Sequence, residues 1–221
     1  MTRVPFDVHR LSGDFAFYDD GWQATLGLRV GDDGHIDAEF RAYDRTRGQF
    51  TTTAVFDESA GPRLLITVSD FNELPQQRYE GYLFRRGPVA FAGRTEWKGQ
   101  PFAFFACRRP PYTLGPLRPE RVHPADFLGT FGLYHDGDHA TLILSGVRES
   151  VLSGILRADG EESPVTATVD PAWPYQLELA VGAQAYTLLM FRQRRTAMAG
   201  WFERAGERLG CYAIRHAGPT S

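Results

Sequence analysis

The stretch FLGTFGLYHDGDHATLIL, residues 127–144, repeats the earlier stretch LSGDFAFYDDGWQATLGL, residues 11–28. At a constant offset of 116 residues, the identical pairs are Gly13/Gly129, Phe15/Phe131, Tyr18/Tyr134, Asp20/Asp136, Gly21/Gly137, Ala24/Ala140, Thr25/Thr141, Leu26/Leu142 and Leu28/Leu144. A second set, at an offset of 107, closes each copy: Tyr79/Tyr186, Phe84/Phe191, Arg85/Arg192, Ala90/Ala197, Ala92/Ala199, Gly93/Gly200, Glu96/Glu203, Gly99/Gly206, Ala106/Ala213 and Arg108/Arg215. The chain is therefore an internal duplication, with residues missing from the middle of the second copy, where loops absorb deletions cheaply.

Each copy has the pattern of a β-meander. Apolar and polar residues alternate over short runs, and turn signals recur about every 8 to 12 residues, as in sandwiches and barrels. Asp20-Gly21 and Asp136-Gly137 each predict a hairpin, because a type I′ turn needs positive φ at both central residues. We predict an all-β fold of two tandem eight-stranded up-and-down barrels, closed so that no edge strand is exposed. A single sandwich built from sixteen strands is the alternative.

Composition indicates a globular chain and excludes several classes of partner. Of 221 residues, 43% are hydrophobic and 23% charged, and the net charge of −3 offers no basic field for nucleic acid or anionic membranes. No window approaches the roughly 18 apolar residues of a membrane helix, and the N-terminal sequence MTRVPFDVHRLSG lacks the apolar core of a signal peptide. Two cysteines do not make a disulfide framework. We expect a cytoplasmic protein without a cofactor.

A proline-rich segment, RRPPYTLGPLRPERVHPADF, separates the copies. Proline removes a backbone donor and favours extended backbone, so this segment predicts a semi-rigid linker and not a strand. A short helix at residues 119–128 is the one helical segment that we expect. The predicted domains are a first barrel at residues 1–109, the linker at 110–126 and a second barrel at 127–221.

Each copy resembles the calycin superfamily, which includes the lipocalins and the avidin-like barrels. The resemblance lies in Gly13-Asp14-Phe15 and Gly129-Thr130-Phe131 at the first strand, and in Arg108 and Arg215 at the last. In that superfamily a Gly-X-Trp sequence opens the first strand, and a basic residue of the last strand packs over the aromatic ring. This chain has Phe in place of Trp. The resemblance implies a cation–π contact at the closed end of each barrel, and a guanidinium over an aromatic face is favourable on physical grounds as well.

A barrel of eight strands either fills its interior with side chains or holds one small ligand. The inward face of the second copy carries more glycine and methionine, and methionine adapts to irregular ligands but also fills gaps. Alternation places a tyrosine and an arginine on the inward face of the sixth strand of each copy, where arginine could grip a carboxylate or phosphate, or pair with a carboxylate at the rim. The candidate ligand-binding residues are Tyr79, Arg85, Tyr186, Met190, Arg192 and Met198.

No pattern predicts a catalytic or metal site. The run His135-Asp136-Gly137-Asp138-His139 contains good zinc ligands, but the hairpin explains its Asp-Gly, and the first copy lacks both histidines, so we predict a surface turn. Asp19 and Asp20 are likewise expected in a solvated turn. Alternation places Cys211 inward and Cys107 outward, as inert thiols.

Some strands carry apolar residues on their outward faces as well, and such area must be covered. These outward residues are Tyr82, Phe84, Phe105, Leu189, Phe191, Trp201, Tyr212 and Ile214. We predict that the two copies pack against each other through them. A homodimer or a partner protein is the alternative.

The function best supported at this stage is non-enzymatic binding of a small apolar or amphiphilic molecule by one barrel. A scaffold with filled barrels and a protein-interaction surface is one alternative. An isomerase or cyclase that shapes its substrate with few catalytic residues is the other.

Overall fold

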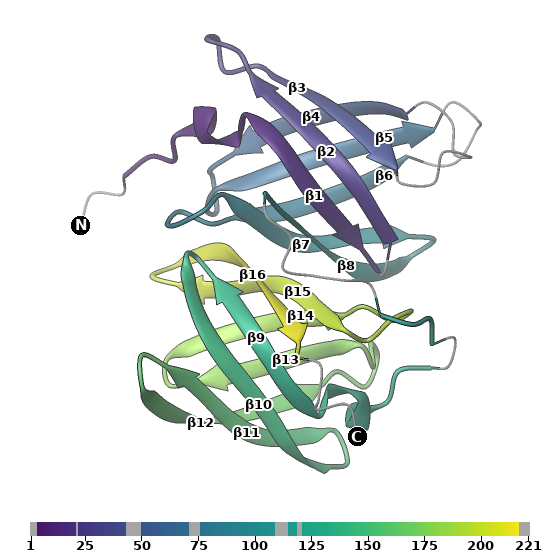
Figure 1. Ribbon diagram of the computed structural model, residues 1–221, viewed down its shortest axis with the longest axis vertical. Coiled ribbons are helices and arrows are strands. Elements are labelled where there is room, and N and C mark those ends of the chain that lie inside the picture. The colour runs from purple at the N-terminus through teal and green to yellow at the C-terminus, as the bar shows by residue number, and fades with distance from the viewer. Residues whose placement is uncertain are drawn as a thin grey trace.

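The first copy forms a closed antiparallel barrel (Figure 1). The computed structural model describes residues 4–20, 22–42, 50–70, 76–108, 115–118 and 121–216. A 3₁₀ helix, η1 (Val8–Leu11), precedes the first strand. The strands are β1 (Gly13–Asp19), β2 (Trp22–Val30), β3 (Ile36–Ala42), β4 (Phe50–Asp57), β5 (Arg63–Asp70), β6 (Gln77–Leu83), β7 (Ala90–Trp97) and β8 (Gln100–Cys107).

The second copy forms another closed barrel with the same strand order. It begins with the 3₁₀ helix η2 (Pro124–Phe127), which lies within the predicted helical segment. Its strands are β9 (Gly129–His135), β10 (Asp138–Arg148), β11 (Val151–Ala158), β12 (Glu161–Val169), β13 (Gln176–Val181), β14 (Gln184–Met190), β15 (Ala197–Arg204) and β16 (Glu207–Arg215). Within the described part of the chain, no helix is long and apolar enough to cross a membrane.

Each barrel closes by antiparallel pairing of its first strand with its last. In the first barrel Ala16 pairs with Cys107, and in the second Leu133 pairs with Ala213. The prediction of two eight-stranded up-and-down barrels is confirmed, and the alternative of one large sandwich is wrong. Closure satisfies the backbone groups that an edge strand would expose.

The closed end of each barrel has the predicted cation–π contact. The Arg108 guanidinium lies 5.4 Å from the centre of the Phe15 ring, and that of Arg215 lies 4.5 Å from the Phe131 ring. Arg215 also donates to the carbonyl oxygen of Leu128 at 2.6 Å. Gly129 has a φ of 137°, and a Cβ there would collide with the Arg215 guanidinium. The glycine therefore permits the stacking.

The interiors are filled mainly by aromatic and aliphatic side chains. In the first barrel the Phe17 ring lies 5.1 Å from both Tyr79 and Phe104, and Phe15 lies 5.3 Å from Phe91. In the second barrel the inner faces of the strands contribute leucine and methionine side chains, and these are buried.

The two barrels pack against each other through β7 and β8 of the first and β15 and β16 of the second (Figure 1). The Phe105 ring lies 5.8 Å from Phe191 and 4.6 Å from Tyr212, which in turn lies 5.9 Å from Phe84. Cys107 is buried in the same layer. The prediction that the outward apolar faces cover each other is confirmed.

Candidate functional site

The Asp-Gly turns of the two copies hold the barrels together by reciprocal contacts. Asp20, after β1, accepts the backbone N–H of Arg192 at 2.5 Å. Asp136, after β9, accepts the backbone N–H groups of Arg85 at 2.5 Å and Arg86 at 3.1 Å. The turn of each barrel therefore binds the loop between the sixth and seventh strands of the other. Such reciprocity is the mark of an approximately two-fold interface.

The expectation that these turns lie in solvent holds for Gly137, Asp138 and His139, which are exposed, but is wrong for Asp20 and Asp136. Asp20 is 4% exposed and Asp136 is 0% exposed. Their positive φ angles, 38° and 48°, fit the predicted turn type. His135 is also buried, 5.4 Å from the Phe202 ring, and not on the surface. The described residues contain no group of three or more His, Cys, Asp or Glu side chains that could hold a metal ion.

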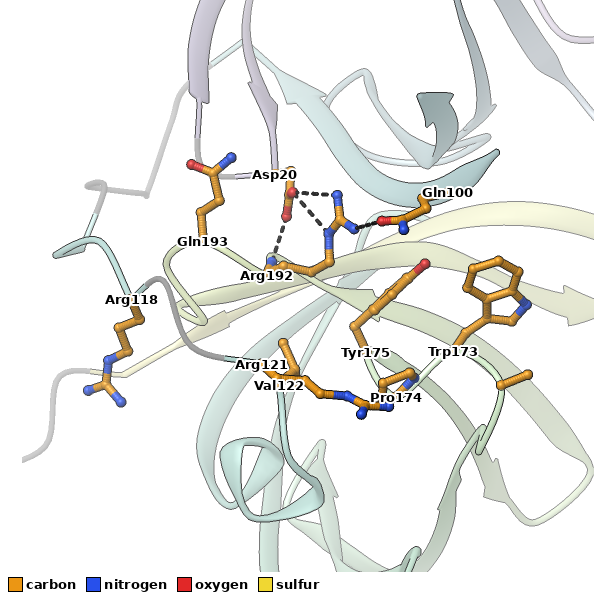
Figure 2. Close-up of a pocket in the computed structure, with 11 residues that line it drawn as sticks. Asp20, Gln100, Arg118, Arg121, Val122, Trp173, Pro174, Tyr175, Arg192 and Gln193 are labelled. Atoms are coloured by element: carbon orange, nitrogen blue, oxygen red, sulfur yellow. Dashed lines mark hydrogen bonds and ion pairs between the residues drawn. The ribbon is translucent and has the colours of Figure 1, made fainter. Parts of the chain in front are cut away.

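A pocket of about 440 Å³ lies between the barrels beside the Asp20 turn (Figure 2). The first barrel contributes the turn and the start of β8, the second contributes the loops before β13 and after β14, and the segment between the copies completes it. The lining residues are Asp20, Gln100, Arg118, Arg121, Val122, Ala172, Trp173, Pro174, Tyr175, Arg192 and Gln193. Its volume is in the range of small-ligand sites, about 300–1,000 Å³.

Arg192 makes more contacts than the other two arginines of this pocket. Its guanidinium lies 3.1 Å from the Asp20 carboxylate, donates to the side-chain oxygen of Gln100 at 2.9 Å and packs 5.1 Å from the Tyr175 ring. Arg118 and Arg121 are exposed, and neither side chain has a hydrogen-bond or ion-pair partner among the described residues. Figure 2 shows Arg118 extending away from the Asp20–Arg192 pair. With three arginines and one aspartate, the lining favours an anion.

Two aromatic residues give the pocket an apolar wall. Trp173 and Tyr175 lie with ring centres 6.1 Å apart. Tyr175 is 6% exposed, and its hydroxyl is buried without a hydrogen-bond partner among the described residues. Burial raises the pKa of this hydroxyl, so it stays protonated and can donate. A buried polar group without a partner is costly.

The pocket lies on one side of the approximate two-fold interface, and the other side has an equivalent region. Leu83 donates to the carbonyl of Pro62 at 2.8 Å, and its counterpart Met190 donates to the carbonyl of Tyr175 at 2.7 Å, so Pro62 and Tyr175 are equivalent. We call the region around Glu58, Gly61, Arg85, Asp136, Glu207 and Arg208 the closed junction, and the pocket region around Asp20 the open junction.

In the closed junction the loop is made of small residues and lies directly against the other barrel. Ala60 accepts the backbone N–H of Arg208 at 3.3 Å, and a Cβ on Gly61 would collide with the carbonyl of Arg208. In the open junction Trp173 takes the place of Ala60. Pro174 and Tyr175 likewise stand in place of Gly61 and Pro62, and the side chains of this loop line the pocket.

The two junctions also differ in charge. Arg85 donates to Glu207 at 2.7 Å and to Glu58 at 2.8 Å in the closed junction. At the offset of 107 residues that relates Arg85 to Arg192, neutral Gln100 replaces Glu207. Pro171, four residues before Tyr175 as Glu58 is before Pro62, replaces Glu58. The open junction lacks both carboxylates.

The structure brings only one of the predicted ligand-binding residues to this pocket. Arg192 lines it. Arg85 lies in the closed junction, engaged by Glu58 and Glu207. The predicted inward orientation of both arginines is wrong, because β6 ends at Leu83 and β14 at Met190, and strand alternation does not continue into the loops.

The other four predicted residues lie inside the barrels, and their role in binding stays a prediction. Tyr79 is in the core of the first barrel. Met190 and Met198 are cross-strand neighbours, Tyr186 lies four residues before Met190 on β14, and all three are fully buried. The predicted positions of Cys211 and Cys107, inward and outward, agree with the strand register, and both thiols are free and buried.

Equivalent polar pairs lie at the end of each interior next to the turns. Tyr79 donates to Asp19 at 2.8 Å, and Tyr186 lies 3.4 Å from Nδ1 of His135. Burial raises the pKa of Asp19 to about 7, although the hydrogen bond from Tyr79 lowers it, and burial lowers the pKa of His135. Asp19 was expected in solvent, but its Oδ1 atom is buried without a partner among the described residues.

Sequence reasoning missed Trp173, Tyr175, Arg118 and Arg121. A signal for the first two was present in the difference between the copies, since Trp-Pro-Tyr at 173–175 stands where the first copy has Ala-Gly-Pro at 60–62. Identities between the copies report the shared architecture. Differences report what one copy has acquired.

Comparison with known proteins adds little. No protein-family model and no curated protein sequence matches the chain. Among solved structures, the chain is similar to a protein of unknown function from the DUF3598 family of Nostoc punctiforme. The two are 11% identical with a TM-score of 0.28, over 96% of this chain and 100% of that one. A TM-score this low establishes neither a shared fold nor a shared function.

Proposed function

We propose that the protein is a non-enzymatic binding protein for a small anionic amphiphile, which it holds in the pocket between its two barrels. The observation that carries the proposal is the broken two-fold symmetry of the interface. In the closed junction two glutamates bind the loop arginine, whereas the open junction has one aspartate for three arginines and is walled by aromatic side chains.

The chemistry of the lining supports each part of this ligand description. Arginine pairs with carboxylate and phosphate groups through directed hydrogen bonds. Trp173 and Tyr175 offer large amphipathic surfaces to an apolar body. The calycin resemblance, with its cation–π contacts at both closed ends, is in keeping with a ligand-binding protein, but the proposed site lies outside the barrel interiors.

The two earlier alternatives fit the pocket less well. A scaffold would explain the filled barrels but not the opening of one junction. An isomerase or cyclase would need an acid or base in the pocket. Among the lining residues the carboxyl group is that of Asp20, and it is already bound to the backbone and side chain of Arg192. We place the protein in the reducing cytoplasm, where its buried cysteines would remain thiols.

The test uses two fluorescent probes of similar size. 1-Anilinonaphthalene-8-sulfonate is anionic, and N-phenyl-1-naphthylamine is its neutral counterpart. We expect saturable binding of the anionic probe at one site per chain, and at least ~10-fold weaker binding by Arg121→Gln, since a charge-assisted hydrogen bond contributes about 1.5–3 kcal/mol.

The matched control is Arg29→Gln, which removes an exposed arginine of β2 outside the pocket lining. It should bind the anionic probe as the parent does. An equal loss of affinity for the anionic probe in both variants would show that net charge, and not the pocket arginine, causes the loss. Equal affinity for both probes, unchanged in Arg121→Gln, would reject the proposed anionic site and favour a filled scaffold.

A further inference from the structure

The closed junction shows what the open junction lacks. In the closed junction the Glu58 carboxylate accepts from the Arg85 guanidinium at 2.8 Å and from the backbone N–H of Phe6 at 3.1 Å. A single carboxylate oxygen, Oε1, receives both bonds. It therefore joins the loop arginine of the first barrel to the segment that precedes its 3₁₀ helix.

Both donors have counterparts in the open junction. Arg192 corresponds to Arg85, because the backbone N–H of each donates to the turn aspartate of the other barrel at 2.5 Å. Val122 corresponds to Phe6, since both precede equivalent 3₁₀ helices at the offset of 116 residues, and both are buried. Val122 and Arg192 line the same pocket.

The acceptor is what the open junction has lost. Proline at position 171 replaces Glu58, and no acceptor for the Val122 N–H is found within the described chain. Val122 as a residue is buried, and native structures nearly always satisfy backbone N–H groups in buried segments. The pocket region thus contains the counterparts of both donors without the carboxylate that joins them in the closed junction, and the Arg192 guanidinium is bound by Asp20 and Gln100 instead.

We infer that the ligand of the pocket is an aromatic carboxylate, whose acid group takes the place that the Glu58 side chain holds in the closed junction. This inference rests on the proposed function and names its ligand class. The carboxylate accepts from Arg192 and from the Val122 N–H, and the exposed Arg121 side chain can also donate to it. The apolar ring of the ligand lies against Trp173.

The experiment restores the missing carboxylate. Position 171 is exposed, so Pro171→Glu and its uncharged match Pro171→Gln alter a solvent-facing loop residue. The probes are 2-naphthoate, naphthalene-2-sulfonate and 2-naphthylmethanol, and their affinities are measured by isothermal titration calorimetry. We expect the parent to bind naphthoate at least ~10-fold more tightly than the alcohol, and more tightly than the sulfonate.

Pro171→Glu should lose naphthoate binding by at least ~10-fold, because its own carboxylate occupies the site, whereas Pro171→Gln should keep it. Sulfonate binding equal to or tighter than naphthoate binding in the parent overturns the carboxylate assignment and leaves the anionic pocket standing. Equal affinity of Pro171→Glu and Pro171→Gln for naphthoate overturns the carboxylate assignment as well. Binding of none of the probes overturns the assignment together with the proposed function.

Discussion

Replacement of Asp136 by asparagine tests the interface directly. The Asp136 Oδ1 atom accepts two backbone N–H groups of the opposite barrel, and Oδ2 accepts from the side chains of Arg86, at 3.1 Å, and Arg204. Asparagine keeps one acceptor oxygen but places an NH₂ group against two guanidinium donors. Two charge-assisted hydrogen bonds are lost at a fully buried site, and each contributes about 1.5–3 kcal/mol.

We therefore expect Asp136→Asn to lower the free energy of unfolding by about 3–5 kcal/mol, the range observed when one partner of a buried ion pair is removed. Equilibrium unfolding in urea, followed by tryptophan fluorescence, measures this loss. The control is Asp138→Asn in the same hairpin, where the ion pair with Arg86 is half-exposed and contributes about 0–1 kcal/mol. A loss below about 1 kcal/mol for Asp136→Asn, or one equal to the control, would refute the reciprocal clamp.

Three further predictions follow from the cores and the interior polar pairs. Arg215→Lys should lose about 1–3 kcal/mol in urea unfolding, since a lysine cannot both cover Phe131 and reach the Leu128 carbonyl, and an unchanged midpoint would contradict this. Phe191→Ser should lose at least about 3–5 kcal/mol, because the ring is fully buried between the barrels, and size-exclusion chromatography should reveal any new association; a monomer of parental stability would show that the interface is wrong. The pKa of Asp19, raised to about 7, means that the folded protein holds a proton there that the unfolded chain releases near pH 4. That stabilisation is present below pH 4 and is lost as the pH rises to about 7. The free energy of unfolding of Asp19→Asn should therefore increase relative to that of the parent between pH 5 and pH 8. A difference between the two proteins that stays constant with pH would contradict the raised pKa.

The duplication and the strand alternation were sufficient to predict the architecture. Recurrence of Arg108 as Arg215, with Phe15 as Phe131, indicated the closed ends, and both contacts are present. The outward aromatic at position 84, repeated at 191, indicated an interface between the copies. These features are local to one strand or repeat within the chain, so a single sequence reveals them.

The burial of Asp20 and Asp136 in the turns could not be predicted in the same way. A hairpin alone accounts for Asp20-Gly21, so nothing in the sequence required that the Asp20 side chain also bind a loop of the other barrel. Arg85 was misplaced because alternation was carried two residues beyond the end of β6. The pocket depends on Trp173 and Tyr175, which have no equivalent in the first copy, and a comparison based on identities passes over them.

The central claim is that the open junction, and not a barrel interior, holds a small acid. A crystal structure of the protein soaked with 2-naphthoate tests it most directly. We predict the naphthoate between the barrels, with its carboxylate on Arg192 and the Val122 N–H and its rings against Trp173. Naphthoate bound among the Met190 and Met198 side chains of the second barrel, with the inter-barrel pocket empty, would contradict the account.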